Sequence, residues 1–372
     1  MALSDDKRNG AIIGHALGDA LGAPCEFYPF PLYTGILNTS IVRYSRAYGR
    51  QVCPIGQITD DTEMALVLME TLNSGYTKEK AVVNYMLWAN NNYEGCKGNM
   101  PFMGKNTRNL FIAPKPSYKL YLNRFNKYYP DENTKEKSQS NGALMRSYPL
   151  AFVEDWDIIR TDVEITNPSE LVQNAVFAYI TAIKMALNGN SKEEIKDVVR
   201  SLHMDKPLSV AFEQACNNEF RDVTNYRGHV VHACYCAFWG LFQFEDYKTA
   251  VDAIISLSPE EDVPAKICEP GKWKKSEVRV GDTDTNAAIA GALLGAFYGL
   301  SAIRSNQITD TNIQILLNCD SRNGDIIRPK KYSISNINLI NVKESITSKS
   351  GTTFIEFNNI DDSKASLELL NN

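Results

Sequence analysis

Glycine recurs at every fourth position near the start of the chain, in the segment GAIIGHALGDALG that runs from Gly10 to Gly22. Residues four apart fall close to one face of an α-helix, so this spacing predicts a helix with one face that carries almost no side-chain bulk. A second stripe, AGALLGAFYG, contains Gly291, Gly295 and Gly299. Each glycine lowers helix propensity by about 1 kcal/mol relative to alanine. Two such stripes therefore indicate close helix packing, and we expect that packing to lie beneath a functional site.

Apolar residues elsewhere recur with the spacing of amphipathic helices. The segment DDTEMALVLMETL carries an i, i+3, i+4, i+7 stripe, and we expect Asp60 to cap this helix while Glu63 completes a capping box. Ser191 and Glu194 have the spacing of a second box. Further helices are predicted over residues 78–90, 169–187, 191–202 and 229–242, and residues 287–303 are predicted to form a buried core helix, slightly short for a membrane span.

These patterns predict an all-α fold, with a compact multi-helix domain over residues 1–303. The C-terminal extension, residues 304–372, is rich in Asn, Ser, Ile and Asp, and we expect it to be less regular. Within it, residues 352–357 form a β-prone run. The polar segment DENTKEKSQS, residues 131–140, is predicted to be a solvated loop.

Charge and cysteine usage exclude several classes of protein. The chain has 39 basic and 44 acidic residues, a net charge of −5, which is unlike a general nucleic-acid binder. Its eight cysteines form no C-x-x-C pair, which favours reduced thiols over a disulfide framework or a zinc ribbon. The first residues, MALSDDKR, carry charge where a secretory signal needs an apolar run. We therefore expect a cytoplasmic monomer that binds neither nucleic acids nor membranes.

Hard oxygen ligands gather at two places, Thr59-Asp60-Asp61-Thr62 and Gly281-Asp282-Thr283-Asp284-Thr285. Each run precedes a predicted helix, and carboxylate and hydroxyl oxygens suit Mg²⁺ or Mn²⁺. Brought together, the two runs could hold two ions that orient a hydroxyl-rich substrate and activate water.

Two other interpretations of these acids stay open. Asp and Thr are favoured helix caps, so either run alone could simply stabilise a helix start. The segment VRVGDTDTN also resembles the nucleophile loop of haloacid-dehalogenase-type phosphatases, in which the first Asp attacks phosphorus. Asn286 at the fifth position and the distance to the other acidic pair disfavour that interpretation.

Taken in order, the motifs resemble the ADP-ribosylhydrolase family, which includes ADP-ribosyl-arginine and ADP-ribosyl-serine hydrolases and the dinitrogenase-reductase-activating glycohydrolase. The resemblance covers roughly residues 10–300. The matching blocks are GAIIGHALGDALGAPCEF, GQITDDTEMALVLMETL, SNGALMRSYPLAF, RGHVVHACYCAFWGLF and GDTDTNAAIAGALLGAFYG, with a segment containing TNP before a helix.

The resemblance implies an all-α domain with two Mg²⁺ ions at the base of an ADP-ribose cleft. It implies that Thr59, Asp60 and Asp61 are ligands of one ion. Asp282, Asp284 and Thr285 are then ligands of the other, with Asp284 shared. Glu26 is the leading general acid/base candidate, and Asp60 and Asp61 are counted with it as catalytic residues. The implied lining of the ADP-ribose pocket is Ser140, Asn141, Gly142, Met145 and Arg146, with Gly104 in the loop GKNTR.

Several other features have a structural interpretation. His15 and Asp19, four apart on the first helix, are expected to be a hydrogen-bonded structural pair, and His229, His232, Cys234 and Cys236 are expected to pack in the core. The aromatic run Tyr118, Tyr121, Phe125, Tyr128 and Tyr129 fits packing better than adenine stacking. Where many relatives carry a histidine, this chain has Asn167, which puts a histidine contact to the substrate in doubt.

The resemblance implies an Mg²⁺-dependent hydrolase, with Mn²⁺ as the alternative ion, that cleaves the glycosidic bond between ADP-ribose and a modified acceptor. We expect that acceptor to be an ADP-ribosylated protein or a small ADP-ribose conjugate, with arginine-linked protein preferred over serine-linked. The alternatives are a catalytically silent ADP-ribose binder and a metal-dependent phosphohydrolase. Retention of Asp60, Asp61, Asp282 and Asp284 disfavours the silent binder.

Overall fold

The computed structural model describes residues 5–26, 41–45, 49–53, 58–90, 103–257 and 280–305, together with four short stretches between residues 321 and 357. Those residues contain fourteen α-helices, two 3₁₀ turns and six short strands paired as three antiparallel hairpins. The helices are α1 (Asp5–Gly22), α2 (Asp60–Asn73), α3 (Lys78–Ala89), α4 (Lys105–Phe111), α5 (Tyr118–Tyr128), α6 (Glu132–Glu136), α7 (Trp156–Thr166), α8 (Glu170–Leu187), α9 (Lys192–Ser201), α10 (Lys206–Cys216), α11 (Val230–Gln243), α12 (Tyr247–Ile255), α13 (Thr283–Tyr298) and α14 (Leu300–Ser305).

The hairpins are β1 (Ile41–Ser45) with β2 (Gly49–Cys53), β3 (Ser321–Arg322) with β4 (Asp325–Ile326), and β5 (Val342–Thr347) with β6 (Thr353–Phe357). The 3₁₀ turns are η1 (Ala23–Cys25) and η2 (Tyr148–Phe152). The all-α prediction is confirmed for the body of the molecule, and β6 coincides with the predicted β-prone run. Apart from the end of α14 and the strands β3 to β6, the C-terminal extension lies outside the described residues.

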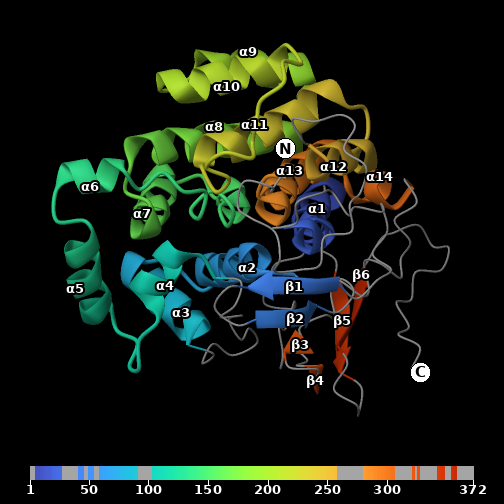
Figure 1. Ribbon diagram of the computed structural model, residues 1–372. Coiled ribbons are helices and arrows are strands. Elements are labelled where there is room, and N and C mark those ends of the chain that lie inside the picture. Colours follow the sequence, from blue (N-terminus) through green and yellow to red (C-terminus); the bar gives the residue numbers. More distant parts are fainter. Residues whose placement is uncertain are drawn as a thin grey trace.

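The two glycine stripes pack face to face, and this contact between α1 and α13 forms the centre of the fold (Figure 1). A Cβ atom on Gly10 would overlap the carbonyl oxygen of Gly295, and one on Gly14 would overlap that of Gly291. Only glycine permits two backbones to approach this closely. At the far end, the Thr283 hydroxyl donates to the Gly22 carbonyl over 2.8 Å. The stripes therefore place the end of α1 beside the start of α13.

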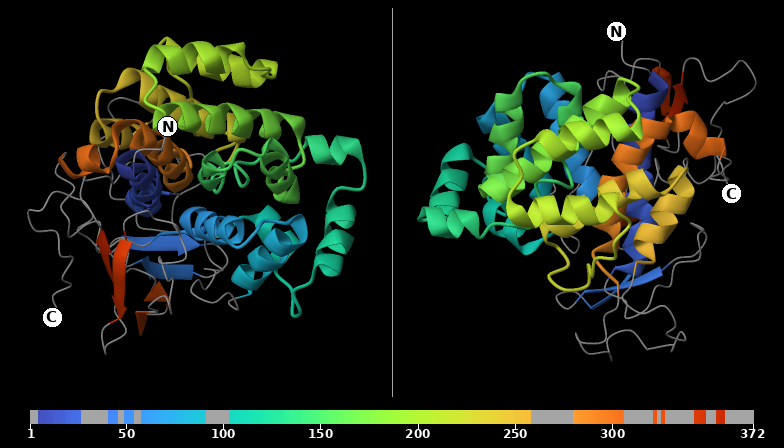
Figure 2. Two further views of the ribbon diagram at one scale, coloured as in Figure 1. Left: turned by 180° about the vertical axis from the view of Figure 1, so that it is seen from behind. Right: turned by 90° about the horizontal axis from the view of Figure 1, so that it is seen from above.

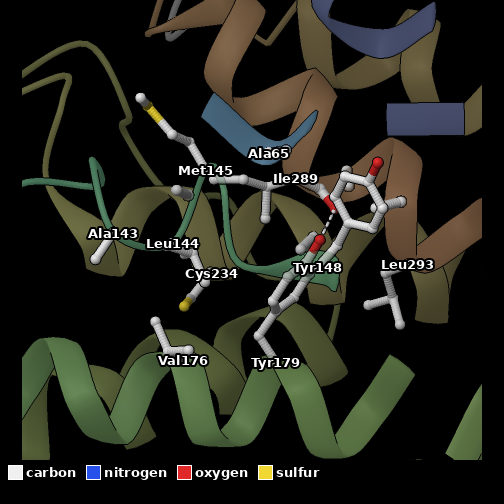
Figure 3. Packing of buried hydrophobic residues seen from close by; sticks show 14 of the residues in the cluster. Ala65, Ala143, Leu144, Met145, Tyr148, Val176, Tyr179, Cys234, Ile289 and Leu293 are labelled. Carbon is white, nitrogen blue, oxygen red and sulfur yellow. Dashed lines mark hydrogen bonds between the residues drawn. The ribbon is translucent and has the colours of Figure 1, made fainter. Parts of the chain in front are cut away.

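Further helices bury the other faces of α13. Helices α8, α11 and α12 pack against it, and α10 and α9 form the outer layer (Figures 1 and 2). The Tyr179 hydroxyl of α8 donates to the Ile289 carbonyl of α13 over 2.8 Å, among buried Tyr148, Cys234 and Leu293 (Figure 3). These contacts hold α13 rigidly, so the acidic residues at its start have a fixed position.

Most predicted helices are confirmed, and helix ends account for the main differences. The box of Ser191 and Glu194 forms as predicted. The predicted cap of α2 is wrong, because the N-cap is Thr59 and Asp60 is already helical. Glu63, predicted to complete a capping box, accepts from the Trp88 indole. The predicted core helix over residues 287–303 is two helices, since Gly299 adopts a φ of +85° that ends α13.

The predicted loop over residues 131–140 contains the short helix α6. Asp131 and Thr134 close a reciprocal capping box at its start. Its five residues are too few for apolar periodicity to show, so the prediction of a loop was wrong although the segment is exposed as expected. No helix among the described residues is long and apolar enough to cross a membrane.

On α11, the predicted core packing is confirmed for the two cysteines and is wrong for the two histidines. Cys234 and Cys236 are buried. His229 is half-buried and caps the helix by accepting from the Val231 N–H, while the half-buried His232 accepts from the Arg221 guanidinium. His229 therefore stabilises the start of α11, and His232 binds Arg221 at the half-buried side of the same helix.

Candidate active site

A cavity of about 520 Å³ opens where the ends of α1, α2, α4, α6 and α13 converge. It brings together side chains that are up to 259 positions apart in the chain, such as Glu26 and Thr285. Its lining includes most of the predicted site: Glu26, Asp60, Asp61, Gly104, Ser140, Asn141, Gly142, Met145, Asp282, Asp284 and Thr285.

Two predicted residues do not line this cavity. Arg146 is completely buried and forms an ion pair with Asp162 at 3.1 Å. Its guanidinium also donates to the Gly142 carbonyl and the Thr166 hydroxyl. The predicted contact of Arg146 with the pocket is therefore wrong, and its role is to hold the turn that carries Gly142. Thr59 is also buried, behind the acidic side chains.

The carboxylates at the base of the cavity form two overlapping groups. One oxygen each from Asp19, Asp61 and Asp284 lie within 4.8 Å of one another, and so do oxygens of Glu26, Asp282 and Asp284. Asp284 belongs to both groups, and it is the residue expected to be shared. Each of the two groups could hold a metal ion, and Asp284 is common to both.

Burial and mutual repulsion raise the pKa values of these acids. Burial raises the pKa of Asp282 to about 7, with Asp284 adding to the rise. The pKa of Asp61 lies well above its usual value because of burial and then the charges of Asp19 and Asp284. Several anions in one buried space are unfavourable unless protons or cations neutralise them. A cation would compete with protons for the same oxygens.

The donor set fits a hard divalent ion. Asp61 is only 2% exposed, and within the described part of the chain its buried Oδ1 atom has no hydrogen-bond partner. A buried carboxylate oxygen without a partner is costly, and coordination would satisfy it. The surrounding ligands are carboxylate and hydroxyl oxygens, which Mg²⁺ and Mn²⁺ prefer.

The opposite side of the cavity is formed by the turn over residues 138–146. Asn141 joins the two sides, because its backbone N–H donates to the Gly228 carbonyl and its side chain donates to Asp282 Oδ2, both over 2.8 Å. Asn167 donates to the Ser138 and Ser140 carbonyls. Asn167 therefore shapes the turn, and it does not line the cavity.

The aromatic run packs as predicted, except at its end. Tyr121 is buried and donates to the Ile165 carbonyl, with the Phe125 ring tilted beside it. Tyr129 lines the cavity and donates to the Thr166 carbonyl, with Asn106 as a second partner. Tyr118 and Phe125 are half-buried against the core, whereas Tyr128 is exposed.

Sequence reasoning missed several contributors to the site. Asp19 was interpreted as a structural partner of His15, yet it belongs to the acidic group. The Thr62 hydroxyl stands between them, 2.6 Å from Asp19 Oδ2 and 3.4 Å from His15 Nδ1. Lys137, which also lines the cavity, had no motif of its own, and Gly228 lies in the matching block RGHVVHACYCAFWGLF without a predicted role. For Asp19, the only signal in the sequence was its i, i+4 spacing from His15.

Comparison with known proteins shows which family the chain belongs to. The sequence model of the ADP-ribosylglycohydrolase family matches residues 2–268 and 278–316. An ADP-ribosylarginine hydrolase, Tri1, of Pseudomonas putida is 25% identical over 80% of this chain and 72% of its own length. The ADP-ribosyl-[dinitrogen reductase] glycohydrolase of Rhodospirillum rubrum is 24% identical over 83% of this chain and 92% of its own.

A vertebrate relative, the ADP-ribosylhydrolase ARH3 of Xenopus tropicalis, is 24% identical over 82% of this chain and 91% of its own length. A solved structure titled ADP-ribosylglycohydrolase-related protein complex superposes with a TM-score of 0.58 at 24% identity, covering 82% of this chain and 91% of that one. This superposition shows that the fold is shared.

Proposed function

Because the chain belongs to the ADP-ribosylglycohydrolase family, whose members are hydrolases acting on glycosyl bonds, we propose that it releases ADP-ribose from a modified protein side chain with two Mg²⁺ ions. The observation that carries the proposal is the pair of acidic groups that share Asp284 at the base of the cavity. Mn²⁺ has the same ligand preferences and is the alternative ion.

The reaction would break the bond between the anomeric carbon of ribose and its acceptor through an oxocarbenium-like state. Bound divalent ions would neutralise the carboxylates and orient the ribose hydroxyls. Glu26 lies within the group that contains Asp282 and Asp284, at the end of α1. From there its carboxyl group would protonate the leaving group or take a proton from water. Asp60 and Asp61, at the start of α2, stand across the same cavity.

The other side of the cavity would receive the rest of the nucleotide. Ser140, Asn141, Gly142 and Met145 line it, with Gly104 at the start of α4. Gly142 has no Cβ atom, so backbone N–H groups there are open to a diphosphate. Affinity for an anion then depends on these local donors, since the chain as a whole carries a net charge of −5.

We propose arginine-linked protein as the preferred acceptor, ahead of serine-linked protein. Support comes from a relative named for hydrolysis of ADP-ribosylarginine. We further propose an intracellular location, which the free thiols of Cys216, Cys234 and Cys236 support.

The test is release of free ADP-ribose from matched arginine-linked and serine-linked peptides, with Mg²⁺ and with a chelator. We expect release from the arginine-linked peptide that the chelator abolishes. Binding of ADP-ribose without release from any peptide would favour the silent binder instead. Release of inorganic phosphate in place of ADP-ribose would favour the phosphohydrolase.

A further inference from the structure

Asp19 occupies a completely buried position on α1, directly behind the start of α2. Its two carboxylate oxygens accept four hydrogen bonds from two threonines. Oδ1 accepts from the Thr59 hydroxyl at 2.8 Å, and Oδ2 accepts from the Thr59 N–H at 2.9 Å. Oδ2 also accepts from the Thr62 hydroxyl at 2.6 Å and the Thr62 N–H at 3.2 Å. Asp19 therefore holds both ends of the segment that contains Asp60 and Asp61.

The Thr59 hydroxyl faces two carboxylates with only one hydrogen to donate. It lies 2.8 Å from Asp19 Oδ1 and 2.8 Å from Asp61 Oδ2. A threonine hydroxyl has one donor hydrogen and two acceptor lone pairs. If the hydrogen goes to Asp19, Asp61 Oδ2 keeps its lone pairs for a cation in the cavity.

The same contacts distinguish Asp19 from the other acids. Asp61 has an oxygen without a partner, Oδ1, whereas both oxygens of Asp19 are engaged by donors from the α2 segment. Asp61 lines the cavity and Asp19 does not. A carboxylate in this situation has little capacity left to bind a cation directly.

We infer that Asp19 is a positioning residue for the metal site: it takes the hydrogen of the Thr59 hydroxyl and fixes the α2 segment, so that Asp61 faces the cation. This inference rests on the proposed function, because it assumes a divalent ion in the cavity. Groups that orient the direct ligands of an ion change metal affinity by roughly 10- to 100-fold when removed.

The variant Asp19→Asn tests the inference, since it keeps the size of the side chain and replaces one acceptor oxygen by an NH₂ group that faces N–H and O–H donors. We would titrate the full chain with Mn²⁺ by calorimetry, after checking by circular dichroism that each metal-free variant is folded. The expected result is roughly a 10- to 100-fold loss of affinity with two ions still bound. Asp246→Asn is the matched control, because Asp246 also accepts from a threonine N–H and a threonine hydroxyl but lies away from the cavity, and its Mn²⁺ affinity should stay within about threefold of the unmodified protein.

A second pair of variants keeps the test decisive if Asp19→Asn does not fold. Thr59→Ser retains the hydroxyl and should bind Mn²⁺ nearly as well as the unmodified protein, whereas Thr59→Val should lose at least about tenfold. Unchanged affinity in Asp19→Asn, or in Thr59→Val, would overturn the inference. Loss of one whole ion in Asp19→Asn would also overturn it, because Asp19 would then be a ligand. If the unmodified protein bound no Mn²⁺, the metal proposal itself would fall, and this inference with it.

Discussion

Replacing Gly18 by alanine would place a Cβ atom against the carbonyl oxygen of Ala287, at the contact between α1 and α13. The matched control is Gly240→Ala on α11, where the new Cβ would lie 2.9 Å from the Cδ1 methyl of Ile254. Both glycines are buried within helices. Alanine raises helix propensity by about 1 kcal/mol at either position, so that contribution cancels in the comparison.

The difference between the two variants comes from what the new methyl group meets. Overpacking a core costs about 1–3 kcal/mol. At Gly240 a flexible side-chain end can rotate away, so the cost stays near the lower limit and the gain in propensity offsets it. At Gly18 two backbones would have to separate, so the upper limit applies. We expect a net loss of about 2 kcal/mol in the free energy of unfolding for Gly18→Ala, and almost none for Gly240→Ala.

Urea unfolding followed by circular dichroism measures both free energies, with a chelator present so that metal binding does not contribute. Gly18→Ala should also lower ADP-ribose release, because it separates the end of α1 from the start of α13, where Glu26 meets Asp282 and Asp284. A Gly18→Ala variant as stable as Gly240→Ala would refute the claim that the glycine stripe exists for close backbone contact.

Three further predictions follow from the buried charges. Asp162→Ala leaves the Arg146 guanidinium buried without its carboxylate and should lower the free energy of unfolding by about 3–5 kcal/mol, and a loss below about 1 kcal/mol in urea unfolding would contradict the ion pair. Because burial raises the pKa of Asp282 to about 7, the folded metal-free protein holds a proton at this carboxyl that the unfolded chain has lost from about pH 4 to 7, whereas His15 and His232, whose pKa values burial lowers to about 4, act in the opposite direction. The contribution of Asp282 to stability should therefore fall as pH rises through that range, and a chelated Asp282→Asn variant whose melting temperature has the same pH dependence as that of the unmodified protein would contradict this. Asp60→Asn and Asp282→Asn should each abolish turnover in a protein that circular dichroism shows to be folded, and full activity in both would refute the two-ion mechanism.

The sequence predicted the central packing because steric size alone decides it. Glycine at every fourth position, from Gly10 to Gly22, has few uses other than close helix contact, and the structure pairs it with the second stripe. The acidic motifs were found for a similar reason, since consecutive aspartates beside threonine before a helix are uncommon. Their proximity, with Asp284 in both groups, follows from that packing.

The errors concern residues whose neighbours are distant in the chain. Arg146 stands in a block that lines the pocket, but its direction depends on Asp162, a partner that no local pattern identifies. The sequence predicted Asp60 as the N-cap of α2, but both Asp and Thr cap helices. The structure has Thr59 there, where its N–H donates to the Asp19 carboxylate 40 positions upstream. The position of Asp19 follows from tertiary contacts alone.

Release of ADP-ribose from an arginine-linked peptide, by the unmodified chain and by Asp284→Asn, tests the central claim most directly. Asp284 is the carboxylate common to both acidic groups, so its loss should affect both ions at once. The account predicts release in the presence of Mg²⁺, none with a chelator, and none from the folded Asp284→Asn variant. Equal release by the variant, or release that a chelator does not change, would contradict it.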